Sequence, residues 1–360
     1  MKKKKVGVAM SGGVDSGVAA ALLVKQGYQC TGFHMLLWKE PGRGFENKCC
    51  STESLEAARK TAHQFGMPFR TVDLSKIFKK KVVDYFLKAY GAGLTPNPCV
   101  MCNQFIKFGQ LLDYVKKLGF DYLATGHYAR IEKNDSVYHL LQGIDKQKDQ
   151  SYFLYNLTQK QLKHVLFPIS KYAKKQVRQM AKKWQLPVAE RPESQEICFF
   201  PESDYRPFLT RQIPEEIVPG EAVDTQRRVI GKHQGIPLYT IGQRHGFTIT
   251  DKKVLGPLYV IDKDTKKNQL IVGFGREAEK KEFLVRGVNW ISGKPPKDKT
   301  SCQVRIRHQG KLLPGQLRLV GEKVTVVLNE SERGVASGQA AVFYQREEIL
   351  GGGIIDWHLV

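Results

Sequence analysis

The sequence has no long hydrophobic run and few acidic side chains for its length. None of its apolar segments approaches the ~20 residues that a membrane-spanning helix needs, so we expect no membrane partner. The basic segment 1–5 is followed by too few apolar residues before Ser11 and Asp15 to form a signal peptide. We therefore expect a protein of the cytoplasm.

Cysteine is also scarce, with seven residues in 360, and the number is odd. A disulfide framework is not expected, and a reducing compartment leaves the thiols available for chemistry. Cys30 and Cys302 lie in apolar, strand-like segments and are expected to be core residues. The adjacent Cys49 and Cys50 receive no chemical role. Cys99, Cys102 and Cys198 remain as candidates for chemistry.

The shortage of acids is most pronounced in one stretch of the chain. Against 57 Lys and Arg residues there are 35 Asp and Glu, which gives a net charge of +22. Between Gln150 and Ala189 there are eight basic residues and no acid. Helical spacing places five of them on one face: Lys171, Lys174, Lys175, Arg178 and Lys182. A solvated helix face is the alternative, but such a face usually mixes both signs, so we predict binding to a nucleic-acid phosphate backbone.

The most informative motif is Ser-Gly-Gly-Val-Asp-Ser at residues 11–16, between an apolar strand-like run and a helical segment at 17–26. Glycines let backbone N–H groups converge on an anion, and the helix N-terminus adds its positive end. Asp15 can cap the helix or orient a metal ion. No Gly-Lys-Ser/Thr follows, so this is not a Walker A loop. It matches the pyrophosphate loop (PP-loop) of enzymes that split ATP between the α- and β-phosphates; an ordinary strand-to-helix turn is the alternative.

Strand-like and helix-like segments alternate over the first ~130 residues, which predicts an α/β class with a parallel sheet covered by helices. Strands are expected at 6–10, 30–35, 69–74 and 121–127, and helices at 17–26, 52–65 and 108–118. Ligands bind at the carboxyl ends of such strands. Met35 and Gly126 fall there together with the PP-loop.

The pattern changes near Pro201, where short alternating strands punctuated by Pro and Gly replace helical periodicity. We expect an N-terminal PP-loop domain at 1–205, with a helical insertion that includes the basic region 150–190. Two small β domains follow, a central one at 206–275 and a C-terminal β-barrel at 276–360. Residues 276–300 are expected to form a linker between the two β units.

The thiols at 99, 102 and 198 admit several kinds of chemistry. Structural zinc would need Cys49 and Cys50 as further ligands, but adjacent cysteines rarely provide two tetrahedral ligands. A thioredoxin-type motif would open its own fold. A persulfide on one thiol, released by attack of a second, suits an enzyme that activates its substrate with a nucleotide. Three thiolates could instead hold an iron–sulfur cluster, an alternative that stays open.

Further motifs show that the chain resembles the tRNA-specific 2-thiouridylase (MnmA/TrmU) family over essentially its whole length. Other PP-loop enzymes share only the first of these motifs. The matching segments lie at residues 9–16, 49–51, 95–98, 102–103, 106–109, 124–129, 148–154, 193–199, 239–244 and 350–355.

The resemblance implies an ATP-dependent sulfur transfer to a wobble uridine. The uracil oxygen at position 2 attacks the α-phosphate, the persulfide sulfur on Cys198 attacks the activated carbon, and Cys102 releases the sulfur through a transient disulfide. Magnesium is expected to accompany ATP. The residues that would bind ATP are Ala9, Met10, Ser11, Gly12, Gly13, Val14, Asp15 and Ser16, with Met35 and Gly126 on the adenine and ribose side.

The resemblance also implies contacts with the tRNA anticodon stem-loop, whose target base must leave the stack to be reached. Asn97, Pro98 and Cys99 would contact that base. A sulfur donor, either a cysteine desulfurase or a relay carrier, is an expected partner, and the protein is expected to be a monomer. Besides the basic face, the positions that match tRNA contacts are His127, Lys148, Asp149, Gln150, Arg307, His308 and Gln339.

One catalytic position departs from part of the family. Several members carry an aspartate with an assigned acid–base role where this chain has Cys99, and a thiol accepts protons at neutral pH only when its pKa is lowered. Two other functions stay open from the residues. A PP-loop ligase for a small metabolite would need neither the basic face nor two distant thiols. A non-catalytic RNA-binding protein would not need Cys198.

Overall fold

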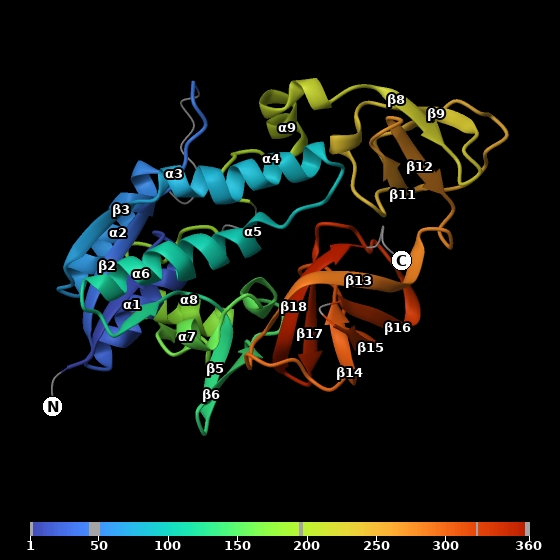
Figure 1. The fold of residues 1–360 in the computed structure, drawn as a ribbon. Helices are drawn as coiled ribbons and strands as arrows, with labels where there is room; N and C mark the ends of the chain where they lie inside the picture. Colours follow the sequence, from blue (N-terminus) through green and yellow to red (C-terminus); the bar gives the residue numbers. More distant parts are fainter. Residues whose placement is uncertain (1–2, 43–50, 194–196, 322, 357–360) are drawn as a thin grey trace.

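A five-stranded parallel sheet forms the centre of the N-terminal part of the chain (Figure 1). The computed structural model describes residues 3–42, 51–193, 197–321 and 323–356. The strand order, with β1 between β2 and β4, puts the PP-loop after β1 at the point where the order reverses, which is where doubly wound sheets bind ligands. In spatial order the strands are β3 (Phe69–Asp73), β2 (Gln29–Leu36), β1 (Lys5–Ala9), β4 (Tyr122–Ala124) and β7 (Val165–Leu166).

Helices cover both faces of this sheet, which confirms the predicted α/β class. On one face α1 (Val14–Lys25) packs beside α2 (Thr52–Gln64) and α8 (Lys174–Lys183). Helix α1 is buried almost all round because small and apolar residues fill it, with Ala19, Ala20 and Ala21 fully buried. Gly27, with φ of +85°, follows the end of this helix.

The opposite face carries two long helical rods. One joins α3 (Ser75–Phe78) and α4 (Asp84–Gly91) through a π-helical segment, Lys79–Val83. The other runs from α5 (Pro98–Met101) through a π-helical segment, Cys102–Leu111, into α6 (Leu112–Lys117). For this second rod the sequence predicted a helix only at 108–118, which is its second half. The rod begins earlier because Asn97 caps it, accepting a hydrogen bond from the Val100 N–H at 3.3 Å, and Pro98 occupies the first turn.

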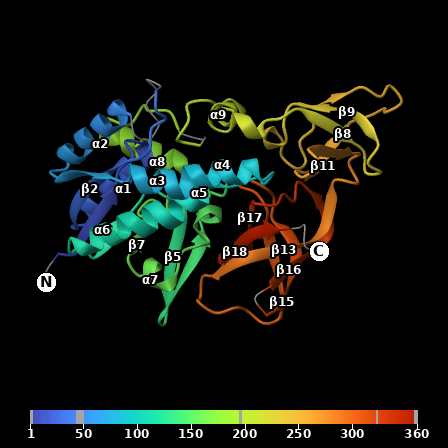
Figure 2. The same ribbon diagram turned by 45° about the horizontal axis from the view of Figure 1, so that its top comes forward.

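Two β units follow the α/β part (Figure 2). Helix α9 (Arg206–Gln212) leads into the central sheet, whose spatial order is β10 (Thr248–Ile249), β9 (Val229–His233), β8 (Gly220–Val223), β12 (Gln269–Gly273) and β11 (Tyr259–Asp264). In the second unit β13 pairs with both β16 and β18, so six strands close into a barrel. They are β13 (Glu279–Trp290), β14 (Lys299–Arg305), β15 (Leu313–Val320), β16 (Lys323–Arg333), β17 (Ala340–Gln345) and β18 (Glu348–Asp356).

Two expectations from the sequence are wrong in detail, and one hairpin was missed. Residues 279–290 of the predicted 276–300 linker form β13, a barrel strand of 12 residues. The region 150–190 is not continuously helical, because a 3-10 turn at Ser151–Leu154, α7 (Gln159–Leu162) and β7 precede α8. A hairpin of β5 (Ala129–Asn134) and β6 (Val137–Gln142) was not expected, and it extends the C-terminal sheet through β18. The described residues contain no helix that is long and apolar enough to span a membrane.

A buried ion pair joins the loop after β6 to the barrel. Asp149 is 3% exposed, and its carboxylate accepts hydrogen bonds from the Gly143 and Ser151 N–H groups and from Arg305 at 3.2 Å. Nearby, the Tyr152 hydroxyl donates to the Ala340 carbonyl at 2.9 Å. The carboxylate of Asp149 is therefore used inside the protein, while the predicted contact of this residue with RNA stays a prediction.

The Asp149–Arg305 pair predicts a large effect of removing one charge. Asp149→Asn leaves the Arg305 guanidinium without its carboxylate, and we expect a loss of about 3 kcal/mol in the free energy of unfolding, measured by urea denaturation. The control is Glu347→Gln, which removes a half-exposed carboxylate paired with Lys146 at 2.6 Å and should cost less than about 1 kcal/mol. Equal effects of the two substitutions would contradict this account.

Candidate active site

Two glycines let the PP-loop pack closely against its neighbours. Gly12 has φ of +76°, and a Cβ built on it would lie 2.2 Å from the Ser54 carbonyl oxygen in the first turn of α2. A Cβ on Gly126 would lie 2.7 Å from the Ser16 nitrogen. Only glycine fits at these two positions. The loop is therefore held between α2 and the polar turn after β4.

The serines of the loop bond to the loop itself. Ser16 Oγ donates to the Gly13 carbonyl at 3.0 Å and accepts from the Ser11 N–H at 3.3 Å. Gly13, the N-cap of α1, supplies no side chain to the first N–H groups of the helix. These groups and the positive end of the helix form a site suited to an anion such as a phosphate.

Asp15 places a carboxylate in the first turn of α1. Its Oδ1 accepts hydrogen bonds from the Tyr128 hydroxyl at 2.7 Å and from Lys174 Nζ at 2.7 Å, and its Oδ2 lies 2.8 Å from the same Nζ. A carboxylate suits magnesium, which usually takes one or two from the protein and the rest of its ligands from phosphates and water. Asp15 could hold a magnesium ion only if the ion replaced the Lys174 ammonium.

A cavity of about 520 Å³ opens beside the PP-loop, at the carboxyl ends of β2 and β3. One lining residue, Leu36, directly follows Met35, which the sequence predicted on the adenine side of ATP. Thr52 and Leu55, which also line it, flank the Ser54 that touches Gly12. The volume falls in the range of small-molecule sites. The other lining residues are Leu36, Leu37, Trp38, Lys39, Pro41, Asp73 and Ser75.

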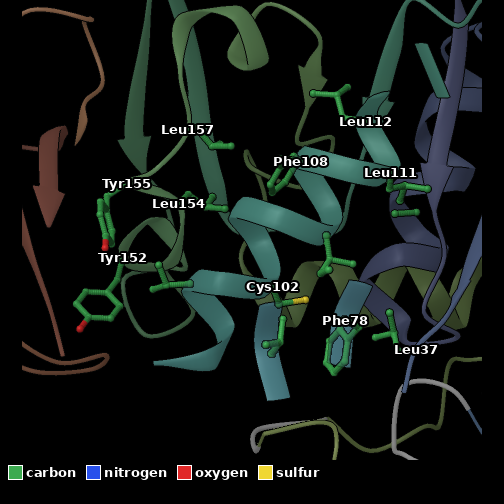
Figure 3. Packing of buried hydrophobic residues seen from close by; sticks show 14 of the residues in the cluster. Leu37, Phe78, Cys102, Phe108, Leu111, Leu112, Tyr152, Leu154, Tyr155 and Leu157 are labelled. Carbon is green, nitrogen blue, oxygen red and sulfur yellow. The ribbon is translucent and has the colours of Figure 1, made fainter. Parts of the chain in front are cut away.

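The three candidate thiols come together at the start of the second rod. Cys99 and Cys102 are three residues apart on the same helix, so they lie on neighbouring turns. Cys198 packs against the hydrophobic cluster that contains Cys102, shown from close by in Figure 3. Among the described residues no cysteine forms a disulfide. Sequence positions separated by almost a hundred residues thus share one region of the molecule.

The Cys99 thiol is poorly suited to act as a base. Burial raises its pKa to about 11, the nearby Cys198 sulfur adds to the rise, and the charge of Lys107 offsets only part of it. At neutral pH Cys99 is therefore protonated and can donate a proton or a hydrogen bond. His127 lies close by, with its Nε2 3.4 Å from Lys107 Nζ, and burial followed by that positive charge holds its pKa well below the usual 6.5.

Aromatic packing fixes the chain directly after Cys198. Phe199 and Phe200 are each 2% exposed, and their rings contact Phe86 of α4 and Phe208 of α9. These rings fill the space between the first rod and the segment that leads to the central β domain. The position of the Cys198 backbone is thus set by the hydrophobic core.

Comparison with known proteins decides the family. The family model of the tRNA methyl transferase HUP domain matches residues 4–202, the tRNA methyl transferase PRC-barrel domain matches 206–274 and the aminomethyltransferase beta-barrel domain matches 280–355. The tRNA-specific 2-thiouridylase MnmA of Carboxydothermus hydrogenoformans is 44% identical over 364 residues, which cover 99% of each chain. MnmA of Chloroflexus aggregans is 45% identical over 351 residues and 97% of each chain. The chain belongs to the tRNA-specific 2-thiouridylase family.

The basic helix of this 2-thiouridylase family member differs from the prediction. Lys171 and Lys175 are exposed, as expected. Lys174, however, is 8% exposed and faces the PP-loop, so its assignment to an exposed phosphate-binding face is wrong. Arg178 is half-buried and pairs with Glu193 at 3.3 Å, while Lys182 pairs with Glu190 at 3.2 Å. The acids that balance this helix lie outside the acid-free stretch.

Several of the residues predicted to meet RNA lie where the α/β part touches the barrel. The Thr95 N–H donates to the Ser337 carbonyl at 2.9 Å, which brings the 95–98 loop to the barrel. The Tyr152 hydroxyl, next to the Asn97 side chain, lies 3.4 Å from Gln339 Oε1. The centroids of the His308 and Phe153 rings lie 4.3 Å apart. Arg307 is exposed. The Gln150 side chain accepts a hydrogen bond from the Tyr128 N–H at 3.0 Å.

The described residues offer no ready-made site for a single metal ion. Within this part of the chain, no three His, Cys, Asp or Glu side chains are grouped to hold one. Cys49 and Cys50 lie outside the described residues. Cys30 is buried, as predicted for a core residue, and Cys302 is partly buried in β14.

Sequence reasoning missed two cationic partners of the PP-loop. Lys174 reaches Asp15, and Arg191 Nη1 donates to the Gly12 carbonyl at 3.1 Å. Neither carries a local signal, because both contacts link positions more than 150 residues apart. The one hint in the sequence was the match of residues 193–199 to a family motif.

The close packing of Gly12 predicts a sharp contrast between adjacent glycines. Gly12→Ala should abolish measurable ATP binding and lower the unfolding temperature, because the new methyl group would overlap the Ser54 carbonyl at a φ that alanine avoids. Gly13→Ala is the control for stability, since its Cβ would lie 3.5 Å from Ser11 Oγ, an ordinary contact. Calorimetry with ATP and thermal unfolding give both readings. Normal ATP binding by Gly12→Ala would contradict the geometry.

The raised pKa of Cys99 predicts an unusual pH profile of alkylation. Because only the thiolate reacts, the rate at Cys99 should still rise about tenfold per pH unit between pH 8 and 10. In the urea-unfolded chain the rate should level off above about pH 9, since an unperturbed thiol has a pKa near 8.5. Iodoacetamide labelling followed by peptide mass spectrometry measures both rates. A plateau below pH 9 in the folded protein would show that Cys99 is an activated thiolate.

Proposed function

We propose that this protein is an ATP-dependent tRNA 2-thiouridylase that converts the wobble uridine of tRNA to 2-thiouridine. The observation that carries the proposal is a PP-loop together with three cysteines, of which Cys99 and Cys102 lie on neighbouring turns of one helix and Cys198 lies near Cys99. Family membership over nearly the full chain supports the same substrate. AMP and pyrophosphate are the expected by-products.

The PP-loop would perform the activating step. Its N–H groups and the start of α1 would hold the phosphates of ATP, with the adenosine toward Met35 and the neighbouring cavity. The uracil O2 attacks the α-phosphorus, the bond to the β-phosphate oxygen breaks and pyrophosphate leaves. When bound, magnesium would neutralise part of the phosphate charge, and Asp15 is the carboxylate in the loop that could hold it. The uracil carbon then carries an AMP leaving group.

The thiols would perform the transfer step. A sulfur donor protein loads Cys198 as a persulfide, and the terminal sulfur attacks the activated carbon while AMP departs with the former uracil oxygen. The Cys102 thiolate then attacks the Cys198 sulfur. The S–S bond to the RNA breaks, 2-thiouridine leaves and a Cys102–Cys198 disulfide remains for an external dithiol to reduce. Cys99, protonated at neutral pH, is suited to hydrogen-bond the base.

The RNA would bind across the junction of the α/β part and the barrel. Asn97, Pro98 and Cys99 face the base, and His308, Arg307 and Gln339 supply contacts from the barrel side. We divide the chain into a catalytic domain at 1–205, a central β domain at 206–275 and a C-terminal β-barrel at 276–360. Lys171, Lys175 and Lys182 extend the basic surface for the RNA backbone. We place the reaction in the cytoplasm and assign it to a monomer.

One assay tests the function. Unmodified tRNA is incubated with the protein, ATP, magnesium, cysteine and a cysteine desulfurase, then digested and searched for 2-thiouridine by mass spectrometry. The wild type should form it, whereas Cys198→Ser and Cys102→Ser should lower the yield at least 100-fold because no persulfide is carried or resolved. Cys302→Ala is the matched control, since that thiol lies in β14 of the barrel, and it should retain activity.

The outcomes separate the alternatives. Thiolation that needs stoichiometric iron under anaerobic conditions would point to a cluster-dependent enzyme. Tight tRNA binding without product would point to a non-catalytic RNA-binding protein. ATP cleavage that does not depend on tRNA would point to another PP-loop ligase.

A further inference from the structure

We infer that Lys148, Lys174 and Arg178 form the cationic site for the pyrophosphate end of ATP, and that the Glu193 carboxylate occupies this site until ATP displaces it. The inference rests on the proposed function, because it assumes that the PP-loop binds ATP. It gives a role to Glu193, which takes no part in the proposed activating and transfer steps. It also assigns Lys148 to the phosphates of ATP instead of to RNA.

Three cations surround a single carboxylate. Lys148 Nζ lies 2.7 Å from Glu193 Oε2, while Arg178 Nη2 and Lys174 Nζ lie 3.3 Å and 3.7 Å from Glu193 Oε1. Burial by itself would raise the pKa of Glu193, but the hydrogen bond from Lys148 and the positive charges together lower it to about 2. Glu193 is thus ionised, and its two oxygens together contact three cations. Two oxygens of a phosphate group could make the same contacts.

One of these cations, Lys174, borders the PP-loop. Lys174 Nζ bridges Glu193 and Asp15, which lies in the first turn of α1 behind the loop. Arg191 holds the chain just before Glu193 against the loop, since its guanidinium donates to the Gly12 carbonyl and to Ser54 Oγ at 3.3 Å. The anion held by these cations is therefore next to the N–H groups that suit a phosphate.

Charge balance explains why the site would favour an incoming polyphosphate. Glu193 brings one negative charge to three positive ones, and Asp15 brings a second to Lys174 alone. The β- and γ-phosphates of ATP carry more charge and more acceptor oxygens than one carboxylate. They can replace Glu193 on Lys148 and Arg178 while the α-phosphate stays at the loop. A carboxylate that must first leave lowers the apparent affinity for ATP.

The test compares Glu193→Gln with wild type. The full-length protein is titrated calorimetrically with inorganic pyrophosphate and with α,β-methylene-ATP, which cannot be split at the relevant bond. Removal of the competing charge should tighten both ligands about tenfold. The matched control is Glu190→Gln, which removes an exposed carboxylate that pairs with Lys182 of α8. The affinities of this variant for both ligands should stay within twofold of wild type. Lys148→Met should weaken pyrophosphate binding.

Unfolding temperatures of the ligand-free proteins separate a binding role from a purely structural one. Glu193→Gln should unfold at a lower temperature than wild type and yet bind pyrophosphate more tightly, a combination that a structural ion pair does not produce. Unchanged or weaker pyrophosphate binding by Glu193→Gln would overturn the inference, as would tighter binding of an anticodon stem-loop RNA alone. If the wild type binds neither ATP nor pyrophosphate, the proposed function itself is wrong.

Discussion

Burial of the Lys174 ammonium against the Asp15 carboxylate is the interaction on which the nucleotide site depends. Burying a charge is costly unless a partner compensates it, and the Asp15 carboxylate, 2.7 Å from Lys174 Nζ, compensates the charge that α8 brings against α1. The apolar side of the interface contributes Val18, Leu22, Val177 and Ala181. One helix thus supplies both a packing face for α1 and a cation for the loop, which places the basic helix directly against the PP-loop.

Local patterns predicted the architecture well where structure is decided locally. The strand-helix alternation and the glycine turn of the PP-loop both depend on residues close in sequence. The strand β13 and the β5–β6 hairpin were missed for the opposite reason. Their strands are stabilised by partners far along the chain, such as β18, and the partly polar sequence of β13 resembles a linker until those partners are known.

The same contrast holds for the site. The loop, Cys102 and Cys198 carry motifs, so the sequence was enough to select them. The environment of each group was not predictable, because burial and distant charges determine it. Cys99 follows an N-cap, where a thiol pKa is often lowered, yet burial beside Cys198 raises it. Lys174 and Arg178 seemed unpaired only because their acids, Asp15 and Glu193, lie outside the acid-free stretch.

The central claim is that the uracil O2 receives the adenylyl group at the PP-loop. A tRNA transcript carrying ¹⁸O at O2 of the target uridine tests it most directly, after one turnover with ATP and persulfide-loaded protein. The account predicts that the ¹⁸O appears in the phosphate of AMP in a one-to-one ratio with 2-thiouridine, because that oxygen leaves the base with the phosphate. Formation of 2-thiouridine with ¹⁸O in water or in pyrophosphate would contradict it.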